Sequence, residues 1–206
     1  MNQKLPDRLA ERLCGPLPTL VGTRFEPEPF PWRCTSPPPD VRPAAVLMLL
    51  YPHEDRWWLP LTLRPADLPA HGGQISLPGG AVEPGETDAD AAVREFHEEL
   101  GDDGQSIRLL GKLSPHYVDA SNFLVVPWVG VVAARPDFTP NPTEVERLLE
   151  VPLSLLLDPA QLGVERRTYR GVGRNVPHLQ FQSHKIWGAT YMMLGQLLLL
   201  TESVGT

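Results

Sequence analysis

The stretch LPGGAVEPGETDADAAVREFHEELG, residues 77–101, is the most informative part of this 206-residue chain. Its second half predicts a helix, because Thr87 is a hydroxyl N-cap and Asp90 follows three residues later, as in a capping box. Gly101 is the residue type that usually follows a helix end. Between these ends, apolar side chains recur at helical spacing: Ala89, Ala92, Val93, Phe96 and Leu100.

The last turn of this predicted helix carries glutamates that repel one another. Glu95, Glu98 and Glu99 are spaced i, i+3 and i+4, so they share one face. Each like-charge pair costs a few tenths of a kcal/mol, and the helix dipole adds a similar penalty. A solvated face is the ordinary explanation of a Glu-rich helix. The alternative is a bound dication, since Mg²⁺ and Mn²⁺ prefer oxygen ligands.

The loop before the helix favours the dication. Gly79 and Gly80 permit a close backbone approach that side chains would block. Pro84–Gly85 predicts a second turn, which brings Glu86 to the helix entrance. Arg94 is expected to form a forked ion pair with a carboxylate, and Glu86 is the partner we predict. The loop backbone is therefore expected to fold back toward the acidic face.

These residues resemble the Nudix box. That pattern reads Gly, five residues, Glu, seven residues, Arg-Glu, any two, Glu-Glu, any one, Gly. Its positions are occupied here by Gly80, Glu86, Arg94, Glu95, Glu98, Glu99 and Gly101. Phe96 and Asp102 depart from the usual aliphatic residues at two further positions. The resemblance implies an α/β (α+β) Nudix fold, in which a mixed β-sheet is sandwiched between helices.

The resemblance also implies hydrolysis of a nucleoside diphosphate linked to another group. It implies a Mg²⁺ or Mn²⁺ site made of three carboxylates and one carbonyl, from Glu95, Glu98, Glu99 and Gly79 or Gly80. Glu86 and Arg94 are then orienting residues. The chemistry agrees, because clustered carboxylates holding dications both neutralise a diphosphate and activate a water. For the general base we favour Glu98, which is next to the metals, over Glu144, a distant carboxylate predicted at the N-terminus of a helix.

A second motif bears on the substrate. LTLRPADLPAHGGQISLPGG, residues 61–80, is similar to a motif of coenzyme A pyrophosphatases, with departures at Pro65, Pro69 and Leu77. This likeness implies hydrolysis of coenzyme A or acyl-CoA to 3′,5′-ADP and (acyl) 4′-phosphopantetheine. Arg64 is a candidate to hold a phosphate, or else it forms a surface ion pair. The other candidate substrate-binding residues are Gly79, Gly80 and Gln74, although Gln74 and His71 are more simply explained as braces of the loop.

Two other functions remain open. Because Pro69 replaces an arginine of that motif, a pyrophosphatase for ADP-ribose, a dinucleotide or a nucleotide sugar is the alternative. A non-catalytic Nudix ligand-binding module ranks last, because no glutamate of the box is missing. A basic cluster is a candidate for the 3′-phosphate of coenzyme A, or is a solvated turn: Arg166, Arg167, Arg170 and Arg174. Four tryptophans are expected in the core rather than stacked on adenine: Trp57, Trp58, Trp128 and Trp187.

The rest of the chain divides into two parts. Residues 1–43 predict a short amphipathic helix followed by a Pro-rich arm, and residues 44–206 the hydrolase domain. The 24 prolines indicate much loop and extended connection. We expect a hairpin of strands 44–51 and 57–64, a loop over 65–85, and strands at 107–114, 123–133 and around Tyr169. Short helices are expected at 144–149 and 152–157, and a closing helix at 186–201.

Composition limits the partners. The formal net charge of −7 and a pI near 5.3 disfavour binding to nucleic acid, which requires a basic surface. No apolar run approaches the roughly 18–20 residues that span a bilayer. We therefore expect a small-molecule nucleotide as the partner, no membrane, and a cytoplasmic protein whose Cys14 and Cys34 are reduced thiols. The arm is expected to cross the sheet or a partner subunit, and the second case predicts a homodimer.

Overall fold

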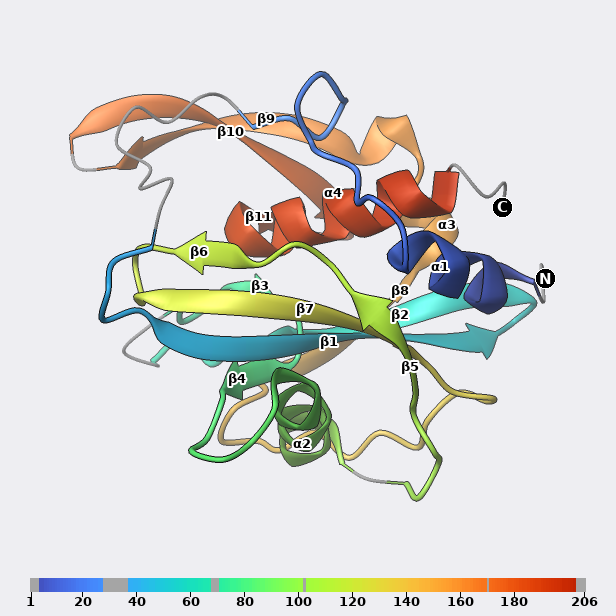
Figure 1. The fold of residues 1–206 in the computed structure, drawn as a ribbon. Helices are drawn as coiled ribbons and strands as arrows, with labels where there is room; N and C mark the ends of the chain where they lie inside the picture. The colour runs from blue at the N-terminus through green and yellow to red at the C-terminus, as the bar shows by residue number, and fades with distance from the viewer. Residues whose placement is uncertain (1–3, 28–36, 68–70, 102, 170, 203–206) are drawn as a thin grey trace.

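The computed structural model describes residues 4–27, 37–67, 71–101, 103–169 and 171–202. The helices are α1 (Leu5–Leu13), α2 (Asp88–Leu100), α3 (Leu153–Leu156) and α4 (Gly188–Glu202), with a 3-10 turn at Pro159–Gln161. The strands are β1 (Arg42–His53), β2 (Arg56–Leu63), β3 (Ile75–Ser76), β4 (Gly79–Ala81), β5 (Arg108–Lys112), β6 (His116–Val118), β7 (Phe123–Val131), β8 (Arg147–Pro152), β9 (Leu162–Tyr169), β10 (Val172–Phe181) and β11 (His184–Trp187). Helix α2 covers one face of the main sheet, and α1 and α4 lie on the other side (Figure 1).

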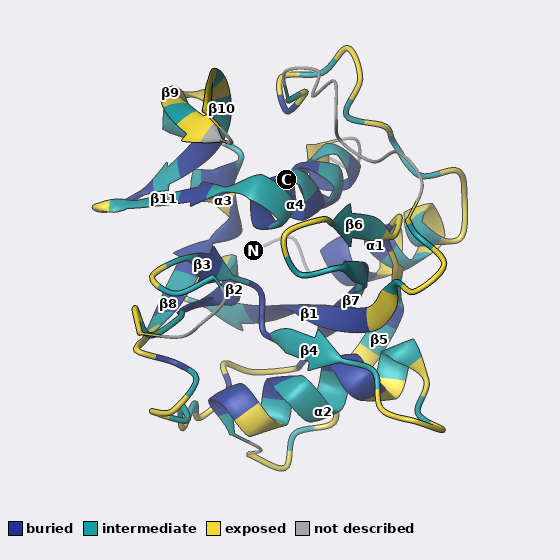
Figure 2. Cartoon of the chain, turned by 90° about the vertical axis from the view of Figure 1, so that its left-hand side faces the viewer, coloured by how far each residue is buried: buried dark blue, intermediate teal, exposed yellow. Residues whose placement is uncertain are grey.

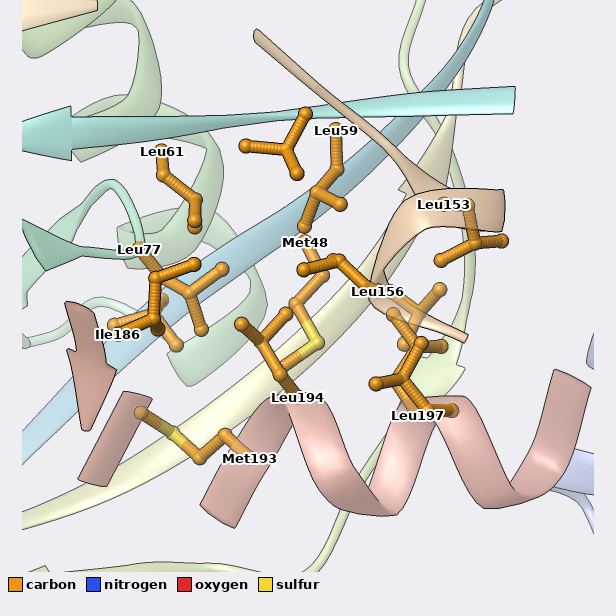
Figure 3. Packing of buried hydrophobic residues seen from close by; sticks show 14 of the residues in the cluster. Met48, Leu59, Leu61, Leu77, Leu153, Leu156, Ile186, Met193, Leu194 and Leu197 are labelled. Atoms are coloured by element: carbon orange, nitrogen blue, oxygen red, sulfur yellow. The ribbon is translucent and has the colours of Figure 1, made fainter. Parts of the chain in front are cut away.

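Strand β1 is the centre of the core because both of its faces are covered. Its side chains alternate between two apolar clusters, as the two-residue period of a strand requires. Ala44, Val46, Met48 and Leu50 belong to the cluster that includes α4, and Ala45, Leu47, Leu49 and Tyr51 belong to the cluster that includes α2. Figure 3 shows the first cluster, where Met48 lies among residues of α3 and α4. A strand buried on both faces is continuously apolar, which explains the run over 44–51.

The main sheet is mixed, and along one of its sides β1 pairs with two different strands in succession; we call the gap between these two pairings the fork. On one side β1 pairs in parallel with β7 over Arg42–Leu50. On the other side it pairs with β4 at Ala44–Val46 and with β2 at Tyr51–His53. Between these pairings, the amide of Leu47 donates to the carbonyl of Pro78 at 2.9 Å. The loop that carries Gly79 and Gly80 is thereby held in the fork, and β4 lies against α2.

Helix α2 is held at both ends. The Thr87 hydroxyl accepts a hydrogen bond from the amide of Asp90 at 3.2 Å, as the capping box predicts. At the other end, helix carbonyls need donors from outside the helix. The amide of Thr139 donates to the Leu100 carbonyl at 2.7 Å, and that of Asn141 donates to the Glu99 carbonyl at 2.8 Å. The segment after β7 is therefore pinned beside the acidic end of α2.

Helix α4 is apolar on all sides, so it must be covered on all sides. The described part of the N-terminal arm supplies one cover. Phe25 is fully buried and packs edge-on against Tyr191 at 6.2 Å between ring centroids. A Cβ added at Gly195 would lie 3.0 Å from the Phe25 side chain, so the two elements are in close contact. Arg24 forms an ion pair with Glu202 and donates to the Leu157 carbonyl at 3.0 Å.

Phe25→Leu is therefore expected to lower the free energy of unfolding by about 1–2 kcal/mol, because it leaves a gap against α4. Urea denaturation followed by tryptophan fluorescence measures the loss. Val21, which is 74% exposed on the same arm, provides the control. Val21→Ala should change the free energy of unfolding by less than about 0.5 kcal/mol. Equal effects of the two substitutions would show that the arm does not stabilise the domain.

Most predicted elements are confirmed. The hairpin of residues 44–51 and 57–64 corresponds to β1 and β2, with β2 ending one residue earlier at Leu63, and the helix after Thr87 ends before Gly101. The short helix near Pro152–Leu157 and the strands at 107–114 and 123–133 are also present. Where the chain is described, no helix combines the length and the hydropathy needed to span a membrane. Cys14 is a free, exposed thiol, and Cys34 lies outside the described residues.

Three predictions of secondary structure are wrong. The predicted helix 144–149 is a turn followed by β8, because Arg147–Pro152 pair with β2 from Trp58 to Leu63. The predicted loop 65–85 contains β3 and β4, which pair with the edges of β2 and β1. The closing helix begins at Gly188, whose φ of +67° ends the extended backbone, so Trp187 lies in β11. In the first two cases, pairing with another strand determines the structure, and in the third the hairpin partner β10 keeps Trp187 extended.

Candidate functional site

The three glutamates at the end of α2 lie at different depths. The Glu99 side chain is buried and the residue is 1% exposed, whereas the Glu95 side chain is 15% exposed and that of Glu98 is 52% exposed. The three side chains differ in exposure because α2 packs one of its sides on β1, while the adjacent side of the helix faces the loop that contains β4. The acidic face therefore runs from the protein interior to its surface.

Arg94 organises this face. Its Nε and Nη2 donate to the two oxygens of Glu86 at 2.9 and 3.1 Å, which is the forked pair that the sequence predicts. Nη1 donates to Glu95 and Glu98, each at 3.0 Å. Nη2 also donates to the Ala81 carbonyl at 3.0 Å. All five N–H bonds of the guanidinium are thus used. Hydrogen bonding to Arg94 lowers the pKa of Glu86, which keeps that carboxylate charged.

Arg94→Lys is expected to lower kcat by about 10- to 100-fold and stability by about 1–2 kcal/mol, because an ammonium has three donors and no fork. Steady-state hydrolysis and urea denaturation measure the two effects. Arg135 provides the control, since it makes a similar forked pair with Glu150 at 2.7 Å. Arg135→Lys should lower stability comparably and leave kcat nearly unchanged. If both variants lose activity equally, Arg94 has no special role in the site.

Glu99 is a buried carboxylate whose negative charge is only partly balanced by hydrogen bonds and a nearby cation. Its Oε1 accepts a hydrogen bond from the Gly79 amide at 3.4 Å and lies 4.0 Å from Nη1 of Arg64. Its Oε2 is buried and has no hydrogen-bond partner. Burial raises the pKa of Glu99 to about 8, because desolvation disfavours the charged form. Burial also raises the pKa of Glu95 above its ordinary value. These are the conditions in which a bound cation stabilises carboxylates.

The loop that carries Gly79 and Gly80 is packed so closely between β1 and the acidic face of α2 that neither glycine has room for a side chain. A Cβ at Gly79 would lie 2.3 Å from the carbonyl oxygen of Ala45, in the backbone of β1. A Cβ at Gly80 would lie 2.4 Å from the carboxyl group of Glu95. The main chain of Gly80 therefore borders the acidic face directly, as the sequence predicts.

The donor set fits a hard dication. Among the described residues, no group of three or more His, Cys, Asp or Glu side chains is arranged as a finished metal site. The reason is visible in the contacts, since Arg94 holds Glu95 and Glu98 while Glu99 points to Gly79. The chemistry of the donors nevertheless suits Mg²⁺ or Mn²⁺, because an unpaired buried carboxylate oxygen lies beside two further carboxylates and a glycine backbone.

Glu144 reaches the same region from a distant part of the chain. The Asn141 side-chain amide donates to its Oε1 at 3.4 Å, and Asn141 is itself pinned to the end of α2. The negative charge of Glu144 contributes to the raised pKa of both Glu95 and Glu99. The structure therefore brings this candidate base near the acidic face, on a turn rather than on the predicted helix.

The second motif forms a braced loop next to the acidic face. Arg64 follows the last residue of β2, where its amide donates to the Gln74 carbonyl at 3.1 Å and its carbonyl accepts from Gly73 at 3.0 Å. The Oε1 of Gln74 is 3.2 Å from Nδ1 of His71, which supports the bracing role that we favour. The Arg64 side chain reaches the acidic face and its Nε is buried without a partner, so it is more than a surface ion pair. Pro69 lies outside the described residues.

The predicted arginine cluster is divided by the strand pleat. Arg167 of β9 is paired in register with Arg174 of β10, so these two share a face. Arg166 is paired with Asn175 and lies on the opposite face. Arg170 lies outside the described residues. The sequence did not single out Glu165 and Lys185, although Glu165 and Arg167 are two residues apart in a strand and therefore share a face.

The tryptophans are half-buried, so the prediction that they lie in the core is only partly right. Trp57 packs on the edge of the cluster that contains α4, and Trp58 and Trp128 pack on the edge of the cluster that contains α2. Trp187 instead lines a hollow beside β3, and the Cζ of Arg167 lies 4.1 Å from its ring centroid.

Comparison with known proteins gives consistent results. Residues 41–171 match the NUDIX domain family. The uncharacterized Nudix hydrolase NudL of Pectobacterium atrosepticum is 37% identical over 174 residues, which are 79% of this chain and 87% of that protein. Nudix hydrolase 3 of Caenorhabditis elegans is 30% identical over 172 residues, which are 76% of this chain and 72% of that protein. The crystal structure of a Nudix hydrolase from M. smegmatis, RenU, matches with a TM-score of 0.56 at 20% identity, over 80% of this chain and 88% of that one, and supports the fold.

Proposed function

The chain belongs to the NUDIX domain family and is a Nudix hydrolase, and from that premise we propose that its substrate is coenzyme A or an acyl-CoA. The reaction would cleave the diphosphate to 3′,5′-ADP and (acyl) 4′-phosphopantetheine. The two motifs supply separate parts of this proposal. The acidic end of α2 supports the hydrolysis of a diphosphate, and the resemblance of residues 61–80 to the coenzyme A motif supports the choice of substrate.

The observation that most supports the substrate is the position of Arg64. Its Nη1 lies 4.0 Å from Glu99 and its Nε is buried without a partner. A guanidinium held beside buried carboxylates, with a donor still unused, is suited to a phosphate oxygen. The backbone of Arg64 is hydrogen-bonded to Gly73 and Gln74. The loop that resembles the coenzyme A motif therefore holds the backbone of the residue that carries this guanidinium.

Each residue of the site then has a task. Glu95, Glu98, Glu99 and the carbonyl of Gly80 are the proposed ligands of Mg²⁺ or Mn²⁺, and Gly79 donates its amide to Glu99. When bound, the ion would neutralise the diphosphate oxygens and lower the pKa of a water molecule. Arg94 and Glu86 hold Glu95 and Glu98 in place. Arg64 contacts the substrate phosphate.

The general base that we propose is Glu98, whose exposed carboxylate can accept a proton from water without a movement of the loop. Glu144 is the alternative, since its negative charge contributes to the raised pKa of Glu95 and of Glu99. Glu98→Gln and Glu144→Gln distinguish the two. The base is the residue whose replacement lowers kcat and also removes the acidic limb of the pH–rate profile.

A substrate panel tests the proposal. The protein is incubated with Mn²⁺ or Mg²⁺ and, in separate reactions, coenzyme A, acetyl-CoA, ADP-ribose, diadenosine polyphosphates and nucleotide sugars, and the products are separated by chromatography. We expect the highest kcat/KM for coenzyme A or its acyl derivative, with 3′,5′-ADP as a product. Much faster turnover of ADP-ribose would overturn the choice of substrate, and it is the outcome that the proline at position 69 favours. The cytoplasmic location and the homodimer stay predictions.

A further inference from the structure

The hollow beside β11 lies outside the machinery described above. It has a volume of about 450 Å³ and is lined by residues 72–75, residues 183–185, Arg167 and Trp187. We call it the β11 pocket. Its two walls come from distant parts of the chain, the motif loop before β3 and the three-stranded sheet of β9, β10 and β11. Figure 2 shows β11 and β3 on the same side of the molecule.

The charges around the β11 pocket favour an anion. Arg167 donates from Nε to Oε2 of Glu165 at 3.0 Å, and Nζ of Lys185 lies 3.2 Å from the other oxygen. Two cations thus share one carboxylate. No Asp or Glu is among the described residues that line the pocket. Arg174, the register partner of Arg167, adds another cation to that face of the sheet. The pocket is therefore locally positive in a chain whose net charge is −7.

The pocket also holds its groups in place. The Arg167 guanidinium lies 4.1 Å from the centroid of the Trp187 ring, and such stacking fixes the plane of the guanidinium. Nε2 of His184 is buried and has no hydrogen-bond partner. A guanidinium and an ammonium that line one hollow are suited to a phosphate.

The β11 pocket and the acidic face are joined through the backbone of Arg64, Gly73 and Gln74. Gly73 and Gln74 line the pocket and are hydrogen-bonded to the backbone of Arg64, whose side chain reaches Glu99. The Thr190 hydroxyl donates to the Ile75 carbonyl at 3.1 Å and fixes the same loop to α4. A ligand that meets both places must carry a second anionic group apart from its diphosphate.

We propose that the β11 pocket binds a phosphate monoester carried on the ribose of the substrate. This inference rests on the proposed function, since coenzyme A has such a group at its 3′ position while ADP-ribose has none. Arg167 and Lys185 bind the dianion, while Arg64 contacts the diphosphate. The pocket thus distinguishes 3′-phosphorylated nucleotides from their dephosphorylated counterparts.

Binding without hydrolysis tests the pocket directly. Isothermal titration calorimetry compares 3′,5′-ADP with 5′-AMP, which differ in the 3′-phosphate alone. The wild-type protein should bind 3′,5′-ADP at least about tenfold more tightly, as charge-assisted hydrogen bonds imply. Arg167→Gln should abolish that preference. Arg166→Gln, on the opposite face of the same strand, is the matched control and should retain it.

A second variant separates binding from folding. Because Arg167 also stacks on Trp187, Lys185→Gln is measured beside it, since it leaves that aromatic contact in place. It should weaken binding of 3′,5′-ADP and leave binding of 5′-AMP within about twofold. The proposal is overturned if the wild type shows no preference, or if Arg167→Gln and Arg166→Gln behave alike.

Kinetics show which of the two proposals fails. Wild-type protein should hydrolyse coenzyme A with a higher kcat/KM than dephospho-coenzyme A, and Arg167→Gln should bring the ratio close to one. If coenzyme A is not hydrolysed but 3′,5′-ADP is preferred in calorimetry, the substrate proposal fails and the pocket stands. If coenzyme A is hydrolysed with no preference for the 3′-phosphate, the pocket proposal fails and the substrate stands.

Discussion

Glu98→Gln is expected to lower kcat by about 10³-fold, which is about 4 kcal/mol of transition-state stabilisation, and to leave the fold intact. The side chain is 52% exposed, and a glutamine oxygen still accepts the hydrogen bond from Arg94. The loss therefore reports chemistry and not packing. Hydrolysis with saturating Mn²⁺ gives kcat, and thermal unfolding without metal should give a Tm within about 2 °C of the wild type.

The same variant distinguishes two tasks of Glu98. If it is a ligand, Mn²⁺ affinity measured by electron paramagnetic resonance falls together with kcat. If it is the general base alone, kcat falls while Mn²⁺ affinity is retained. Glu11→Gln, which makes the same charge change at an exposed position of α1, is the control and should alter neither. An unchanged kcat in Glu98→Gln would remove Glu98 from the site.

Gly79→Ala is expected to lower the free energy of unfolding by about 3 kcal/mol or more. The φ angle at Gly79 is +153°, which L side chains rarely adopt. The new methyl group would also lie 2.3 Å from the Ala45 carbonyl oxygen and 2.6 Å from the Val46 Cα. These atoms belong to β1, which pairs on both edges and cannot move aside. Urea denaturation measures the loss, and the displaced loop should reduce hydrolysis as well.

Gly85→Ala is the matched control, because it separates backbone strain from steric conflict. Gly85 has a φ of +86°, and no other atom lies within 4 Å of an added Cβ. Its substitution should cost only about 1 kcal/mol, the price of that backbone conformation. If Gly79→Ala is no more destabilising than Gly85→Ala, the close approach of the loop to β1 is not needed for stability.

The acidic helix could be predicted because its signals are local. The capping of Thr87, the stop at Gly101 and the shared face of Glu95, Glu98 and Glu99 all depend on residues within four positions of one another. The pair of Arg94 with Glu86 was also predictable, since it joins the two ends of one short segment. The spacing of these residues is also what identifies the family.

Elements that depend on distant partners could not be predicted in this way. Residues 144–149 resemble a helix when read alone, yet the chain extends from Arg147 as β8 because it pairs with the edge of β2. The four arginines resemble one cluster, yet the pleat of β9 turns Arg166 away from Arg167. Periodicity over a few residues cannot reveal which strand will be the neighbour, and that neighbour decides both the conformation and the exposed face.

The sequence by itself determined the acidic helix and its glycine loop, because short-range geometry places those groups wherever the helix forms. The class of reaction followed from the resemblance of that segment to the Nudix box. Only the tertiary structure decided how deeply Glu99 is buried, that Glu144 approaches it, and that Gly73 and Gln74 of the motif loop line the β11 pocket. Those features depend on contacts between segments that are far apart in the sequence: the turn of Asn141 beside the end of α2, and the loop before β3 beside β11. Burial and charge at such contacts depend on the packing of segments that are in places more than a hundred residues apart, which no local pattern encodes.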